Sequence, residues 1–239
     1  MTQLSPLALM ELQVRTLYEL DAFGRIVRPN TGAEPPIPRP VSPFFMGRTH
    51  AGNVVLLHQD LPAKVAAELR TLAAAEPIAH DFESAPRQLF PLLHALRRHT
   101  STTEIHRGPA FTFPEELAAA PGHVRQLTRN ETHLLHPELA EWAVDFPNCE
   151  PAFAAFVDGV AVAICACARS ARGGAEAGVE TAASFRGKGY APAATVAWAQ
   201  SIRDSGRVPF YSTSWENAAS RAVARKLNLV LFGEDIHVS

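Results

Sequence analysis

The sequence lacks the features that mark several classes of protein. No apolar run approaches the roughly 20 residues that a membrane-spanning helix needs. The first residues have neither the basic segment nor the apolar core of a signal peptide. Cysteine is rare: Cys149, Cys165 and Cys167 match no metal or redox spacing, and we expect the last two on one face of a strand as small core residues. These absences predict a globular protein of the reducing cytoplasm.

A strong excess of charge of either sign is also missing. The 22 Lys and Arg residues nearly balance the 24 Asp and Glu residues, which gives a formal charge of -2 and an isoelectric point of about 6.6. This balance argues against a nucleic acid or membrane-surface partner held by bulk electrostatics. The patterns Gly-x-Gly-x-x-Gly and Gly-x-x-x-x-Gly-Lys-Ser/Thr are absent too, which argues against a nucleotide-binding protein.

Histidine is plentiful, with ten residues, but the histidines do not form a metal-binding pattern. The closest group is His94, His99 and His106. His94 and His99 are five residues apart and fall on different faces of an expected helix. We therefore expect solvated or locally hydrogen-bonded histidines and no metal site.

Residues 1–115 contain no recognisable motif and predict a smaller α+β domain. The six prolines between Pro29 and Pro43 predict an extended loop. The other expected elements are a helix that begins at Ser5 and Pro6, a strand within residues 21–28, two strands between Phe44 and His58 with a turn at His50–Asn53, helices at Pro62–Ala75 and Leu89–His99, and a short helix after a capping box at Thr112–Glu115.

The most informative stretch of the sequence lies between Val179 and Ala191. A strand ends at Thr181, and the run Arg186-Gly187-Lys188-Gly189-Tyr190-Ala191 then opens an Ala-rich helix. A strand, a loop with two glycines and a helix expose backbone N–H groups at the positive end of the helix. Glycine lets the main chain approach a ligand closely and adopt positive φ. This stretch therefore predicts an anion site that suits a pyrophosphate.

The order Arg-x-x-Gly-x-Ala, directly after a strand and at the start of a helix, resembles the pyrophosphate signature of the GNAT N-acetyltransferase superfamily. A second match begins at Asn217, has Ser220 three positions on, and ends in Lys226-Leu227. In that family an Asn followed by a small or hydroxyl residue opens the helix after the fifth strand and holds coenzyme A. The resemblance implies acetyl-CoA as co-substrate, bound by Val179, Thr181, Arg186, Gly187, Lys188, Gly189, Tyr190, Ala191, Asn217 and Ser220.

The resemblance also implies the fold: an α/β (α+β) protein with a GNAT-like, mixed and largely antiparallel twisted sheet. The family core would span about 123–239, so the expected domains are 1–115, a degenerate GNAT-like half, and 116–239, the catalytic domain. A hairpin at Asp158-Gly159 and a capping box at Thr128–Glu131 support this layout. The expected strands are 123–128, 150–157, 160–168, 176–181, 208–213 and 230–238, with helices at 191–204 and 217–227 and a helical region toward Trp142.

Alternation along the strand that precedes the loop assigns its side chains to two faces. Ala177, Val179 and Thr181 face one side, where they suit packing against helices, and Glu176 and Glu180 face the other. Transfer of an acyl group to an amine requires a neutral amine, and a carboxylate near the thioester can take its proton directly or through water. We expect Glu180, and next Glu176, to do so. The alternative is that either carboxylate only pairs with Arg or solvent.

Two departures from the family pattern concern the leaving group and the helix end. Many relatives have a Tyr as general acid two residues before the Lys-Leu pair, where this chain has Ala224. Ser220, Tyr190 or water could then protonate the thiolate, or no acid is needed. Asn228 replaces a common Gly and tolerates the left-handed conformation. By the same resemblance, backbone groups at 179–181 would flank the pantetheine arm, and one N–H there would polarise the thioester carbonyl. The candidates for contact with the 3′-phosphate are Lys188, Arg221 and Arg225. The candidates for the lining of the acceptor cleft are Trp215 and Phe146.

We therefore expect an acyl-CoA-dependent N-acyltransferase, with acetyl as the acyl group, that transfers directly to an amine in a ternary complex. The acceptor would be a small-molecule or peptide amine, and a homodimer is left open. The alternative is a non-catalytic acyl-CoA-binding module or regulator, which the missing Tyr favours and the complete pyrophosphate loop opposes.

Overall fold

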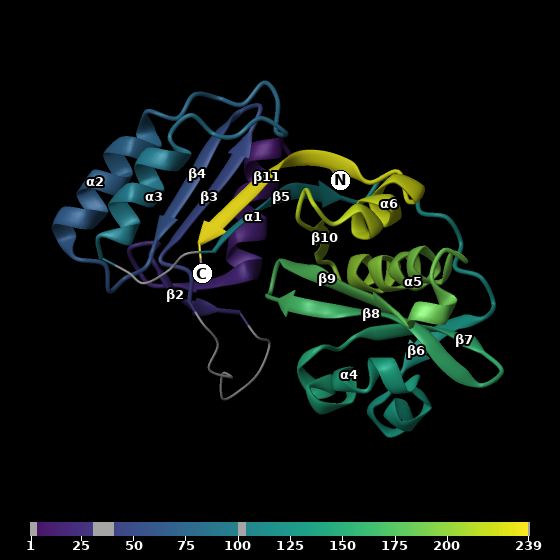
Figure 1. The fold of residues 1–239 in the computed structure, drawn as a ribbon. Helices are drawn as coiled ribbons and strands as arrows, with labels where there is room; N and C mark the ends of the chain where they lie inside the picture. Colours follow the sequence, from purple (N-terminus) through teal and green to yellow (C-terminus); the bar gives the residue numbers. More distant parts are fainter. Residues whose placement is uncertain (1–3, 31–40, 100–103, 239) are drawn as a thin grey trace.

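The computed structural model describes residues 4–30, 41–99 and 104–238. These residues build one nine-stranded sheet in the order β4-β3-β11-β5-β10-β9-β8-β7-β6 (Figure 1). All neighbouring strands are antiparallel except β9 and β10, which are parallel. The predicted mixed, largely antiparallel sheet is thus confirmed. The strands are β3 (Phe44–Thr49), β4 (Gly52–Leu57), β5 (Ile105–Thr112), β6 (Val124–Leu127), β7 (Ala152–Val157), β8 (Val160–Ser170), β9 (Gly174–Thr181), β10 (Val208–Ser212) and β11 (Val230–Val238), and a separate ribbon pairs β1 (Tyr18–Leu20) with β2 (Ile26–Pro29).

Helices cover both faces of this sheet because its side chains are apolar on both faces. One face carries α2 (Ala63–Ala74) and α3 (Leu89–Arg97) over β3 and β11, and α5 (Tyr190–Asp204) and α6 (Ala218–Lys226) over β8 to β10. The other face carries α1 (Pro6–Leu17) and, over β7 and β8, the turns that lead to α4 (Glu141–Val144). No helix in the described part of the chain is long and apolar enough to cross a membrane.

The strand β5 was not predicted, although it lies in the middle of the sheet between β10 and β11. Pro109 hides it from a sequence reading, because proline is rare inside central strands. The structure tolerates this proline because β5 pairs with β10 only through residues 110–112. Pro109 therefore has a strand partner on the β11 side alone. The sheet is continuous across the expected domain boundary at residue 115, and the division into two domains stays a prediction.

Several local predictions for residues 1–115 are confirmed. Ser5 caps α1, since its Oγ accepts a hydrogen bond from the N–H of Ala8 at 3.2 Å. The hairpin β3–β4 turns at residues 50–51, and α2 and α3 lie where helices were expected, although α3 ends at Arg97. The strand expected at 21–28 is present but shorter, because β2 begins only at Ile26. One prediction is wrong: Thr112 ends β5, and the described residues 113–123 contain no helix. Most of the proline-rich segment, residues 31–40, lies outside the described residues.

The predictions for the C-terminal half agree more closely with the structure. Asp158 and Gly159 join β7 to β8 with φ of 48° and 80°, as a tight hairpin turn requires. The capping box at Thr128 and Glu131 forms with both of its hydrogen bonds, but the helix that it opens is a 3₁₀-helix. Cys165 and Cys167 pack on the α5 face in the core, as expected, and all three cysteines are buried and belong to no disulfide.

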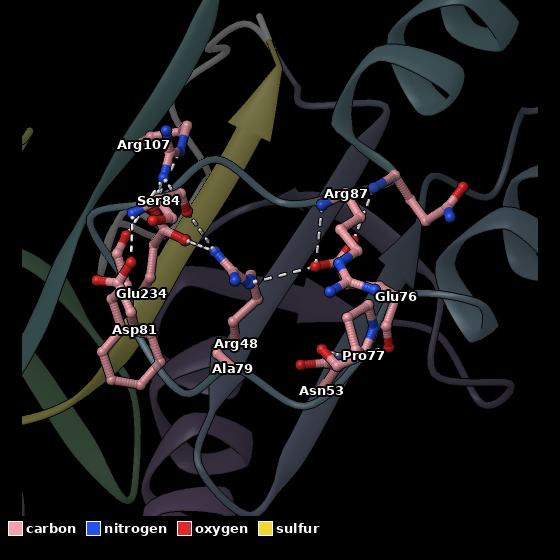
Figure 2. A network of polar contacts seen from close by, with 12 residues as sticks. Arg48, Asn53, Glu76, Pro77, Ala79, Asp81, Ser84, Arg87, Arg107 and Glu234 are labelled. Carbon is pink, nitrogen blue, oxygen red and sulfur yellow. Dashed lines mark hydrogen bonds and ion pairs between the residues drawn. The ribbon is translucent and has the colours of Figure 1, made fainter.

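A buried ion network fastens the segment between α2 and α3 to the sheet (Figure 2). Glu234 on β11 binds Arg48 of β3, with Oε2 2.6 Å from Nη1, and Arg107 of β5, with Oε1 2.6 Å from Nη2. Both arginines also donate to the carbonyl oxygen of Ser84. Glu76 accepts hydrogen bonds from the backbone N–H groups of Arg87 and Gln88, just before α3 begins, and so holds the entry to that helix. The Glu234 carboxylate therefore joins β3, β5 and β11 and, through the two arginines, the loop that contains Ser84.

Candidate functional site

Strands β9 and β10 separate partway along their length. Their parallel pairing ends at Glu176 and Phe210, whereas β9 continues to Thr181 and β10 to Ser212. Each strand stays paired on its other side, β9 with β8 and β10 with β5. The sheet therefore opens into a wedge, and Glu176 and Phe210 lie at its vertex.

The loop that follows β9 enters α5 through two glycines in the left-handed region. Gly187 has a φ of 77° and Gly189 a φ of 91°, where a residue with a Cβ is strained. Gly189 is the N-cap residue of α5, and no side chain within the described structure caps this helix end. The first N–H groups of this 15-residue helix are thus left for an acceptor from outside, such as a phosphate oxygen.

The wedge, this loop and α6 border a cleft with a volume of about 530 Å³. Of the ten residues predicted to bind the cofactor, nine line this cleft. Lys188 is the tenth, and its Nζ lies 5.1 Å from the centre of the Phe185 ring, outside the cleft lining. The nine residues are Val179, Thr181, Arg186, Gly187, Gly189, Tyr190, Ala191, Asn217 and Ser220.

The start of α6 is fixed by its cap. Asn217 accepts a hydrogen bond through Oδ1 from the N–H of Ser220 at 3.0 Å. Of the basic residues near this helix, Lys226 lines the cleft. Arg221 instead donates to the carbonyl oxygen of Trp215 and lies 3.6 Å from a carboxylate oxygen of Glu83. The cleft therefore offers Lys226 as a cation for a phosphate, a residue that the sequence reading had used only as a motif landmark.

Glu176 is a buried carboxyl group at the vertex of the wedge, on the face that α1 covers. Its Oε2 accepts a hydrogen bond from Nε2 of Gln13 at 3.3 Å, whereas Oε1 is buried and makes no hydrogen bond of normal geometry within the described structure. Burial raises the pKa of Glu176 to about 7, against the lowering effects of Ser212 and Gln13. A carboxyl group with such a pKa can accept and release a proton near neutral pH.

Glu180 is an exposed residue on the same face, at the open end of the wedge. Its Oε2 accepts a hydrogen bond from Nε1 of Trp142 at 2.7 Å. The Trp142 ring covers Gly178 so closely that a Cβ there would lie 2.8 Å from the ring. The predicted alternation is confirmed, because Val179 packs on the α5 side while both glutamates contact helices of the opposite face.

Tyr211 on β10 is a cleft residue that sequence reasoning missed. Its hydroxyl lies 2.6 Å from Oγ of Ser220, and both residues line the cleft. Burial raises the pKa of Tyr211 to about 12, against the lowering effect of the hydrogen bond with Ser220. The alternation along β10 could have placed this side chain on the α6 face, but only after the pairing with β9 was known.

Two aromatic residues expected at an acceptor cleft have other positions. Phe146 is fully buried in the core beneath the turns of the α4 region. Trp215 donates through Nε1 to Oε1 of Glu234 at 2.9 Å and so belongs to the ion network. Neither lines the cleft. Among the described residues, no group of three or more His, Cys, Asp or Glu side chains could hold a metal ion.

The structure is similar to solved acetyltransferases of the GNAT superfamily. An acetyltransferase of the GNAT family from Colwellia psychrerythraea matches with a TM-score of 0.50 and 13% sequence identity, over 100% of this chain and 97% of that one. A GCN5-related N-acetyltransferase from Kribbella flavida matches with a TM-score of 0.43 and 20% identity, over 62% of each chain. The chain thus has the GNAT fold, and the first of these likenesses extends through both halves.

Comparisons with protein-family models and with curated protein sequences found no match. At identities of 13% and 20% the structural likeness concerns the fold alone. The chemistry must be argued from the residues of this chain.

Proposed function

We propose that this protein is an acyl-CoA-dependent N-acyltransferase that uses acetyl-CoA and transfers the acetyl group directly to an amine. The observation that carries the proposal is the wedge between β9 and β10, with a glycine loop at its mouth and Glu176 at its vertex. The loop suits the pyrophosphate, and the wedge suits the extended pantetheine arm that must bring a thioester to the carboxylate. The GNAT fold supports this assignment.

The backbone of Val179 to Thr181 would flank the pantetheine arm. Pairing between β9 and β10 has ended here, so within the described structure the backbone groups on this edge of β9 have no partner strand, although the carbonyl oxygen of Thr181 accepts a hydrogen bond from Nε of Arg186 at 3.2 Å. A backbone N–H aimed at the thioester oxygen would stabilise the negative charge that develops during attack. Lys226 would meet a phosphate of the coenzyme, because it is a cation among the cleft residues.

Glu176 is the better candidate for the group that takes the proton of the amine, and Glu180 for a residue that binds the acceptor. Burial places the pKa of Glu176 at about 7, close to the operating pH at which a general base is most effective. Since Gln13 covers the carboxylate, the proton would reach it through a water molecule or after a small shift of α1. Glu180 already holds a hydrogen bond with Trp142 at the entrance.

The amine would be a small molecule or a peptide. The experiment that tests the proposal is isothermal titration with acetyl-CoA, followed by measurement of thiol release with a panel of primary amines and peptides. Tight binding and amine-dependent thiol release are expected. If acetyl-CoA does not bind, the proposal is wrong.

A non-catalytic acyl-CoA-binding protein remains the second candidate, because Ala224 replaces the Tyr that many GNAT enzymes use. Ala224 has no polar side-chain atom and is 2% exposed, so it cannot donate a proton or a hydrogen bond to the leaving group. Binding of acetyl-CoA without release of thiol to any amine would favour this candidate.

A further inference from the structure

The proposed reaction leaves a thiolate on coenzyme A, and Ala224 has no hydroxyl group that could donate a hydrogen bond to it. Two hydroxyl groups nevertheless meet in the cleft, from different elements. Tyr211 comes from β10 and Ser220 from α6, and their oxygen atoms are 2.6 Å apart. Tyr211 and Ala224 belong to the same core cluster, so the small side chain at 224 leaves the tyrosine ring room beneath α6.

We propose that Tyr211 and Ser220 act together as the hydrogen-bond donor that stabilises the departing thiolate. The inference rests on the proposed function, and it places this pair at the leaving group, where many GNAT enzymes have a helix tyrosine as general acid. Both side chains line the cleft, beside the stretch of β9 expected to hold the thioester arm.

The number of hydrogen atoms in the pair supports this role. Each hydroxyl group carries one hydrogen and can also accept, so the two groups share two hydrogens. Their mutual hydrogen bond uses one of them. The Tyr211 hydroxyl also lies 3.3 Å from the carbonyl oxygen of Ser220, a longer contact that a stronger acceptor can replace. One O–H is therefore left to donate to an anion in the cleft, whichever residue donates within the pair.

Acidity decides between donation and full proton transfer. The pKa of Tyr211 is raised to about 12, whereas an ordinary thiol has a pKa of about 8.5. A phenol that is the weaker acid keeps its proton and stabilises the thiolate as a charged hydrogen-bond acceptor. The pair thus differs from a general acid, because it remains protonated after the leaving group has gone.

The atoms and electrons of the step balance. The lone pair of the neutral amine forms the N–C bond, the C–S bond breaks, and its electron pair stays on sulfur. The amine proton goes to the base, for which Glu176 is proposed, and from there to solvent. The thiolate accepts a hydrogen bond from the pair and takes its proton from solvent as coenzyme A departs.

The test uses Tyr211→Phe, which keeps the ring and removes the hydroxyl group. Two measurements are made: the turnover number with acetyl-CoA and an amine, and the pKa of the thiol of bound coenzyme A from the ultraviolet absorbance of its thiolate. Turnover should fall about 10-fold to 100-fold, the effect of one lost hydrogen bond to a charged group. The thiol pKa should rise by about one unit, which corresponds to a 10-fold change, and affinity for coenzyme A should change little.

Tyr18→Phe is the matched control. Tyr18 is also a buried tyrosine beside a serine, Ser42, but it does not line the cleft. Loss of the Tyr18 hydroxyl group should leave the turnover number and the pKa of the bound thiol unchanged. Ser220→Ala should lower turnover like Tyr211→Phe, Ser220→Thr should restore it, and the double variant Tyr211→Phe/Ser220→Ala should be little worse than either single variant, because the pair acts as one unit.

Three results would overturn the inference: unchanged turnover in Tyr211→Phe, reduced turnover with an unchanged thiol pKa, or additive losses in the double variant. If Tyr211→Phe does not fold, the same two measurements on Ser220→Ala and Ser220→Thr test the inference: turnover and the thiol pKa should change in the first variant and return toward the wild-type values in the second. Failure of the proposed function looks different, because the wild-type protein itself would then fail to bind coenzyme A or to release thiol with any amine.

Discussion

Arg48 and Glu234 are 186 residues apart in the sequence, yet their side chains form a direct ion pair in the interior. Nη1 of Arg48 lies 2.6 Å from Oε2 of Glu234, and the carboxylate is completely buried. The other carboxylate oxygen binds Arg107 and Nε1 of Trp215, which precedes the cap of α6 by two residues. The pair thus connects the N-terminal half to one wall of the cleft.

Replacement of the buried acid should destabilise the protein strongly. Glu234→Gln keeps the shape but removes the carboxylate that Arg48 and Arg107 share, so that Arg48 keeps only Glu76, whose Oε1 lies 3.7 Å from its Nε. Removal of one partner from a buried ion pair costs about 3 to 5 kcal/mol. The free energy of unfolding from a denaturant titration measures this cost. Glu68→Gln is the control, because its pair with Arg98 is exposed and should contribute less than about 1 kcal/mol. Equal effects of the two substitutions would contradict the structural role given to Glu234.

Gly189→Ala should weaken binding of acetyl-CoA by about 10-fold or more, because the left-handed backbone that aims the N–H groups becomes strained by roughly 1 to 2 kcal/mol. Gly206→Ala is matched to it: Gly206 has a φ of 79°, and an added Cβ at either position meets no atom within 4 Å. Gly206 lies after α5 and away from the cleft, so its substitution should lower stability but not affinity. Titration calorimetry of both variants decides whether the loop binds the cofactor.

Asn217→Ala should raise the KM for acetyl-CoA and lower the stability of the protein by about 1 kcal/mol, the usual cost of a lost helix cap. Asn217→Asp retains an acceptor for the N–H of Ser220 and should recover the stability. Steady-state kinetics and thermal unfolding of the two variants separate the cap from any contact with the coenzyme. A KM that stays at the wild-type value in Asn217→Ala would mean that the residue serves only the helix.

Glu176→Gln should reduce turnover by about 10²-fold or more, the usual scale of a general base. In the wild-type enzyme, kcat/KM should rise with pH through about 7 as this carboxyl group ionises, and the variant should lose that dependence. Glu180→Gln should change the KM for the amine more than turnover, because Glu180 lies at the entrance. A Glu176→Gln enzyme with the wild-type rate and pH profile would return the role to Glu180 or to water.

Glu176→Gln should also stabilise the protein at alkaline pH. The folded-state pKa of Glu176, about 7, is raised above its ordinary value of 4.5, so the folded protein holds this proton more tightly than the unfolded chain does. The contribution of Glu176 to stability is therefore fully present below pH 4.5 and is lost as the pH rises to about 7, by at most about 3 kcal/mol. Thermal unfolding of Glu176→Gln and wild type across this range should show a difference that grows with pH and then levels off.

The sequence allowed the glycine loop before α5 and the start of α6 to be predicted because each is a contiguous run with a local signal. Gly187 and Gly189 mark a left-handed turn before a helix, and Asn217 is a recognisable cap. The strand β5 could not be found in this way, since Pro109 contradicts the usual signal of a central strand. A capping pattern at Thr112 was misleading for a related reason: the pairing of β5 with β10 and β11 overrides a local preference for a helix.

The roles within the site depended on contacts that no local pattern contains. The sequence favours Glu180 over Glu176 because Glu180 lies beside the backbone expected to hold the thioester. Alternation puts both on one face and cannot show which of the two is buried. The difference comes from α1, whose Gln13 is 163 residues away in the sequence. Tyr211 was missed likewise, because its partnership with Ser220 requires a strand and a helix to pack against each other.

The place of β11 between β3 and β5 has a consequence for how the protein folds. β11 stands at the end of the printed sequence, but it pairs in the interior of the sheet with strands whose residues lie up to 192 positions earlier, as in the pair of His237 with Phe45. Pairing over such distances must close very large loops before it gains any stability, which makes folding slow. While β11 is unpaired, the facing edges of β3 and β5 present open backbone groups to other chains. We expect this interval, rather than the folded state, to be the time at which the protein is most prone to aggregate.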